Sequence, residues 1–203
     1  MKTNKLKLIG ASLAVTASLA LPITGVLAAS NTTTIKGTVS SVITISTGSE
    51  IDISVTPVGL ESRISSAKDT VIINSNHSTG YNLTIAMNGT NQNLTREGGT
   101  ETIAPVNGTQ TSPATLAKNR WGYRVDDVGE FGAGPSVVLS SAEDTTLTFA
   151  AIPTTDSPDN IGSSNQPSVS GGDAYDVWYA MNVDTTKPTG TYTGTVIYTA
   201  TAQ

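Results

Sequence analysis

Residues 175–183 read YDVWYAMNV, and residues 192–200 read YTGTVIYTA. In both stretches apolar side chains recur at every second position. Side chains of a β-strand point alternately to its two faces, so a period of two indicates a strand with one buried face. We therefore predict that both stretches are strands of a common core.

The same alternation extends to other parts of the chain, at residues 51–55, 81–87 and 147–151. Glycine and asparagine, which suit tight turns, separate these segments; they occur in Thr47-Gly48-Ser49, Ser78-Thr79-Gly80 and Asn88-Gly89-Thr90. Many short strands with regular turns are typical of a β-sandwich. The sequence thus predicts an all-β fold, an antiparallel immunoglobulin-like β-sandwich with long loops and at most one short helix.

The short helix is expected at residues 112–117, SPATLA, because a serine cap is followed by proline at the first helical position. Two long loops are expected on either side of it. Residues 88–112 are rich in Asn, Gly and Thr, with an apolar island at 103–106, and residues 153–174 are rich in Ser, Pro, Asn and Gly. Loops of this length are commonly functional.

The first 29 residues have the order of a secretory signal. Residues 2–7 are rich in lysine, residues 8–21 are largely apolar, and residues 26–29 (VLAA) end the segment with small side chains. The apolar run is short for a membrane span. We expect residues 1–29 to be cleaved. Residues 30–203 are then a single β-sandwich domain, secreted or displayed at the cell surface, with no transmembrane anchor in the mature chain.

Charge and cysteine content exclude several functions. Removal of the signal takes three lysines away and leaves eight Lys and Arg residues against 16 acidic ones, a net charge of −8. Such a surface repels phosphate backbones, so we expect no nucleic-acid partner. The chain has no cysteine, so its stability depends on the core, without disulfides.

The sequence holds no recognisable catalytic set, and we predict that the protein is not an enzyme. Its one histidine, His77, lies in a turn signal, and no Gly-x-Ser-x-Gly motif is present. Nucleophilic catalysis needs a base beside the nucleophile, and zinc sites need several His or Cys ligands. No cofactor is expected, apart from a possible calcium ion.

Calcium prefers oxygen ligands, and two acidic groups are candidates for it. The first group is Asp126, Asp127 and Glu130, and the second is Asp173 and Asp176. Neither has the alternating spacing of a dedicated calcium loop. The alternative is that these acids are solvated loop residues.

Three aromatic residues are candidates for ligand binding, because aromatic rings stack on sugars: Trp121, Tyr123 and Trp178. Aromatic residues are only 5% of the chain. A sandwich core needs their bulk, so core packing is the alternative interpretation.

The closing residues 187–202, KPTGTYTGTVIYTATA, resemble the last strand of the cell-wall-binding WxL domain. Tyr192 matches the tyrosine of that family, whereas Tyr198 and Ala200 stand where its Trp and Leu belong. A broader resemblance covers NSNHSTGYNLTI and SPATLAKNRWGYRVDDVGEFG together with residues 179–202, YAMNVDTTKPTGTYTGTVIYTATA. It is to secreted surface proteins common in candidate-phylum bacteria such as Saccharibacteria, and it implies a location and a fold.

These observations lead to three functional hypotheses. The first is a non-catalytic extracellular surface or envelope protein that mediates adhesion or structural coverage, with its long loops contacting another surface protein. The second is a carbohydrate- or cell-wall-binding module that recognises a surface glycan. The third is a self-assembling, pilus-like subunit, in which residues 31–40, NTTTIKGTVS, complete the sheet of a neighbouring copy.

Overall fold

The computed structural model describes residues 31–134 and 136–203. Val39–Gln203 form one compact unit, and residues 31–38 belong to a separate one. Residues 31–38 are exposed and lie outside any strand. The predicted signal peptide, residues 1–29, lies outside the described residues.

The described residues form strands and no α-helix. None of their segments forms a helix with the length and apolar character that a membrane crossing requires. The strands in chain order are β1 (Ile43–Ser46), β2 (Arg63–Ser75), β3 (Tyr81–Met87), β4 (Leu94–Arg96), β5 (Thr102–Pro105), β6 (Ala114–Thr115), β7 (Arg120–Val125), β8 (Thr148–Phe149), β9 (Asp159–Ser164), β10 (Asp173–Val183), β11 (Tyr192–Thr193) and β12 (Val196–Ala202).

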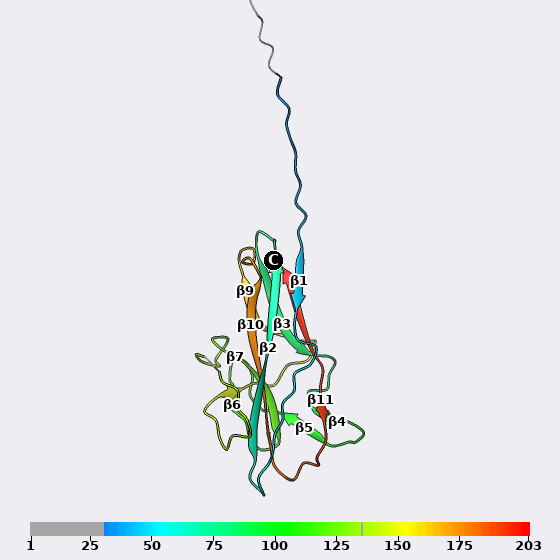
Figure 1. Ribbon diagram of the computed structural model, residues 1–203, viewed down its shortest axis with the longest axis vertical. Helices are drawn as coiled ribbons and strands as arrows, with labels where there is room; N and C mark the ends of the chain where they lie inside the picture. The colour runs from blue at the N-terminus through cyan, green and yellow to red at the C-terminus, as the bar shows by residue number, and fades with distance from the viewer. Residues whose placement is uncertain (1–30, 135) are drawn as a thin grey trace, which may run out of the picture. The chain divides into compact units, whose positions relative to one another are not determined.

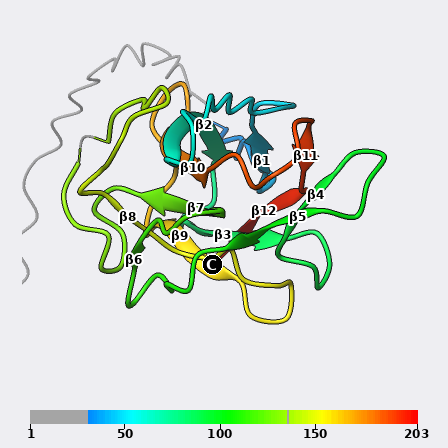
Figure 2. The same ribbon diagram turned by 90° about the horizontal axis from the view of Figure 1, so that it is seen from below.

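The strands assemble into a large sheet, a small sheet and a two-stranded sheet of β6 and β8. The large sheet has seven strands in the order β1-β2-β10-β7-β5-β4-β11, and the small sheet has the order β12-β3-β9. Figure 2 shows β2 and β10 on one side of the core and β3 and β9 on the other, and the long strands run side by side in Figure 1. Neighbours are antiparallel except β5 and β7. The fold is therefore all-β and β-sandwich-like, as predicted; the immunoglobulin-like arrangement stays a prediction.

The core lies between the inward faces of the two sheets. In β3 the alternation predicted from the sequence is confirmed, because Tyr81, Leu83, Ile85 and Met87 are all buried. Their side chains join a cluster that includes Val71 and Ile73 from β2, Val177 from β10 and Ile161 from β9. Apolar burial at about 25 cal/mol per Å² makes this cluster the main stabilising contribution in a chain without disulfides.

The helix predicted at residues 112–117 is wrong. Thr109 and Ser112 exchange backbone hydrogen bonds of 3.1 and 3.0 Å, which close a tight turn before Pro113. Ala114 and Thr115 then pair with β8 as strand β6. Tertiary pairing therefore outweighs the local capping signal.

The two predicted long loops are partly ordered into strands. Residues 88–112 contain β4 and β5, and the apolar island at 103–106 supplies the buried Ile103 of β5. Residues 153–174 contain β9, which pairs with β3. Strands this short show little alternation of apolar and polar residues, so the composition of these segments resembles that of loops.

The turn predicted at Ser78-Thr79-Gly80 is present and leads into β3. Gly80 has φ of +83°, and a Cβ at this position would collide with the carbonyl oxygen of Ser164. Gly89 also has a positive φ, +105°, but a Cβ there would meet open space. The positive φ favours glycine at both positions, but only at Gly80 does a neighbouring segment leave no room for a side chain.

We predict that Gly80→Ala lowers the free energy of unfolding by more than about 2 kcal/mol, because backbone strain and a collision with Ser164 act together. Gly89→Ala, the matched control, carries only the strain and should lose about 1 kcal/mol. Urea denaturation of the two variants measures the difference. Equal losses would contradict the close approach of the Gly80 turn to β9.

Candidate functional site

Residues 49–55, which follow β1, have the side chains of a strand but no strand partner. Ile51, Ile53 and Val55 are partly buried and pack against the core, while Asp52 and Ser54 are exposed. No sheet pairing and no backbone–backbone hydrogen bond joins residues 49–55 to the rest of the described chain. The alternation of buried and exposed side chains predicted from the sequence is confirmed, but the prediction of a paired strand at residues 51–55 is wrong. We call residues 49–55 the open segment.

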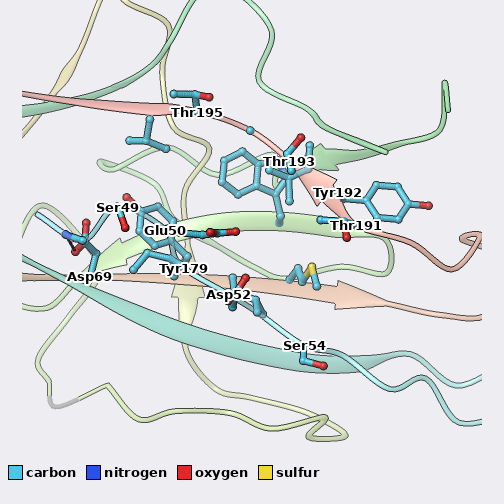
Figure 3. Close-up of a pocket in the computed structure, with 18 of the residues that line it drawn as sticks. Ser49, Glu50, Asp52, Ser54, Asp69, Tyr179, Thr191, Tyr192, Thr193 and Thr195 are labelled. Carbon is cyan, nitrogen blue, oxygen red and sulfur yellow. Dashed lines mark hydrogen bonds between the residues drawn. The ribbon is translucent and has the colours of Figure 1, made fainter. Parts of the chain in front are cut away.

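The opposite wall is formed by two strands that each have a hydrogen-bonded partner strand on one side only. β11 is the last strand of the large sheet and pairs only with β4, and β12 is the last strand of the small sheet and pairs only with β3. Between this wall and the open segment lies a groove of about 740 Å³. Figure 3 shows Ser49, Asp52 and Ser54 on one side of it and Thr191, Thr193 and Thr195 on the other.

The floor of the groove consists of aromatic and aliphatic side chains at the margin of the core. Trp121, Tyr179 and Met181 come from β7 and β10, and Leu94 and Tyr198 come from β4 and β12. The indole N–H of Trp121 donates to the carbonyl oxygen of Gln92 at 2.9 Å. Leu94, Met181 and Tyr198 remain partly exposed, so the groove is a strip of core that lacks a cover.

The groove continues past the end of the open segment. A second hollow of about 430 Å³ shares Val55, Met181 and Tyr192 with the first and reaches Pro57 and Lys187. Residues 47–57, which line the two hollows on one side, would span roughly 36 Å if fully extended. A groove of this length suits an elongated ligand.

Charge and polarity differ between the rim and the floor. Glu50 and Asp52 are exposed on one rim, whereas the floor holds the hydroxyl groups of Tyr179 and Tyr198, which hydrogen-bond to each other. Burial raises the pKa of both phenols above the ordinary tyrosine value, and the nearby Asp69 adds to this effect. Both tyrosines therefore stay neutral, and the acidic residues that line the groove are Glu50 and Asp52 on the rim and the buried Asp69 beside the tyrosines.

The three aromatic residues proposed as ligand-binding have little exposed ring surface. Trp121 is 4% exposed, Tyr123 is 0% and Trp178 is 8%. Tyr123 donates from its hydroxyl group to Asp159 at 2.5 Å, and the ammonium group of Lys68 lies 5.8 Å from the ring centre of Trp178. Their burial agrees with the core-packing alternative, and their role in ligand binding stays a prediction. Of the three, only Trp121 lines the groove.

The acidic candidates for calcium are spread over separate contacts. Asp173 accepts a hydrogen bond from the hydroxyl of Tyr81 at 2.7 Å, and Asp176 accepts from the ammonium of Lys68 at 2.8 Å. Asp127 and Glu130 are exposed. Within residues 31–134 and 136–203, no three His, Asp or Glu side chains gather to hold a metal ion.

The remaining candidate, Asp126, belongs to an arginine-centred network that sequence reasoning missed. Arg124 is 2% exposed and donates to Asp126 at 2.7 Å and to Ser136 at 2.6 Å. Its other N–H groups reach the carbonyl oxygens of Phe131, Gly132 and Ala133. Partial burial alone would raise the pKa of Asp126, but hydrogen bonds from Ser136 and Arg124 hold it below its usual value.

Comparison of the chain with protein-family models, with curated proteins and with solved structures found no match.

We predict that Arg124→Met lowers the free energy of unfolding by about 3–5 kcal/mol, because it removes the charged partner of Asp126 and the donor to the carbonyl groups of Phe131 and Ala133. Arg120→Met is the matched control; Arg120 makes one hydrogen bond, to the carbonyl oxygen of Pro105 at 3.1 Å, and its loss should cost about 1 kcal/mol. Thermal and urea unfolding compare the two. A smaller loss for Arg124→Met than for Arg120→Met would contradict the network.

Proposed function

We propose that the protein is a non-catalytic, exported surface protein whose groove accepts an extended segment of a partner polypeptide as an additional strand. The observation that carries this proposal is the open segment, which has the side-chain pattern of a strand but lacks a sheet partner. Export is supported by the lysine-rich and apolar opening of the chain.

Backbone chemistry favours a peptide as the occupant. Unpaired N–H and C=O groups at a sheet edge are a template for another strand, and each new hydrogen bond contributes a net 0.5–1.5 kcal/mol, in order of magnitude. An inserted strand would face such groups along both walls of the groove. Its inward side chains would also cover the partly exposed Leu94, Met181 and Tyr198.

The other two hypotheses have less support. Sugar recognition needs an exposed ring face, and Trp121, Tyr123 and Trp178 are buried. Adhesion through the long loops loses part of its basis, because β4, β5 and β9 use parts of those loops as paired strands. The groove, by contrast, combines an open backbone edge with apolar surface, which is the combination that strand addition uses.

Pairing through the backbone depends little on sequence, so we expect a synthetic peptide of alternating valine and threonine to bind the purified protein saturably. NMR chemical-shift changes should centre on residues 49–55 and 191–196. The matched control replaces two inner residues of the peptide with proline, which removes their N–H groups and should abolish binding. Equal binding of the proline peptide, or shifts confined to other surfaces, would contradict the proposal.

A further inference from the structure

We infer that the strand received by the groove is residues 31–39 of a second copy of the same chain, so that copies join head to tail. The inference rests on the proposed function, because it names the occupant of the same groove. We call residues 31–39, NTTTIKGTV, the arm.

The arm has the composition of a strand that lacks a sheet. Ile35 is 91% exposed and Val39 is 88% exposed, the highest values among the large apolar residues described as exposed. In an extended arm these two side chains share one face with Thr33 and Gly37, while Thr34 and Lys36 lie on the other. One face is therefore suited to an apolar floor and the other to solvent.

The length of the arm suits the groove. Nine extended residues span roughly 30 Å, which is within the roughly 36 Å that residues 47–57 would span if fully extended. The arm can thus lie along the groove with Ile35 and Val39 over the floor that Trp121, Tyr179 and Met181 provide.

The polar faces are complementary as well. With Ile35 and Val39 facing inward, Lys36 faces outward, and it is the only charged residue of the arm. The outward side chains of the open segment include the acids Glu50 and Asp52, and those of the opposite wall are Thr191, Thr193 and Thr195. Opposite charges and threonine pairs across neighbouring strands are both stabilising.

The arm is too short to fill the groove of its own copy. Asn76 holds the chain just before β1, since its side chain accepts from Val42 N–H at 2.7 Å and donates to the carbonyl oxygen of Ser40 at 2.9 Å. Any reversal must therefore occur before Ser40. After a turn and a passage along β1, too few residues of the arm would remain to cover the open segment, so a second copy is the better donor.

Sedimentation velocity over rising protein concentration tests the inference. The unmodified protein should form a series of oligomers. The double variant Ile35→Lys/Val39→Lys places two charges over an apolar floor and should weaken association at least about 100-fold. The matched control, Thr34→Lys/Thr38→Lys, changes the outward face and should weaken it less than about threefold. In dilute solution, where the protein is monomeric, both variants should keep the unfolding midpoint of the unmodified protein, because the changed side chains are exposed in the monomer.

A charge exchange tests the register of the arm. Lys36→Glu should weaken association roughly fivefold, and the further change Glu50→Lys/Asp52→Lys should restore it. Failure of the second change to restore association would contradict the pairing of Lys36 with this rim.

The inference and the proposed function can fail separately. If the protein stays monomeric at all concentrations, or if oligomers persist in Ile35→Lys/Val39→Lys, the arm is not the occupant and the inference is overturned. The proposed function then still stands when the valine–threonine peptide binds the groove. If that peptide does not bind either, both are overturned.

Discussion

This structure depends on one constraint: the backbone N–H and C=O groups of an extended segment need hydrogen-bond partners. Residues 49–55 pack Ile51, Ile53 and Val55 onto the core, yet their backbone groups face no neighbouring strand. β11 and β12 end their sheets on the other side of the same groove. Sheet edges that remain open invite another chain, and natural proteins cover, charge or use them. Here one rim is charged, by Glu50 and Asp52, while the backbone remains uncovered.

The groove and the core are parts of one packing arrangement. Tyr179 and Tyr198 satisfy each other's hydroxyl groups at the groove floor, so these rings can lie at the margin of the core without an unpaired polar atom. The fully buried Leu83, Ile85 and Ile161 stabilise the sandwich independently of any occupant. This separation explains how the domain can be stable while one strip of apolar surface stays open for binding.

Alternation in the sequence was sufficient to predict the all-β class and the buried face of residues 81–87, because a period of two is a local property. It failed for the helix at residues 112–117, where pairing of Ala114 with Phe149 outweighs the capping signal. The groove could not have been predicted, because whether residues 51–55 find a partner depends on where β11 and β12 lie. Burial of Trp121 and Trp178 is likewise a property of tertiary packing, and the sequence left it open.

Amide hydrogen exchange at residues 49–55 tests the central claim most directly. In the dilute protein these amides should exchange rapidly, in contrast to those of the neighbouring strand β2, because they lack backbone partners. Their exchange should slow as the concentration rises and a strand enters the groove, while exchange in β2 stays unchanged. Protection of residues 49–55 in the dilute protein, equal to that of β2, would contradict the account, since it would mean that the segment is already paired.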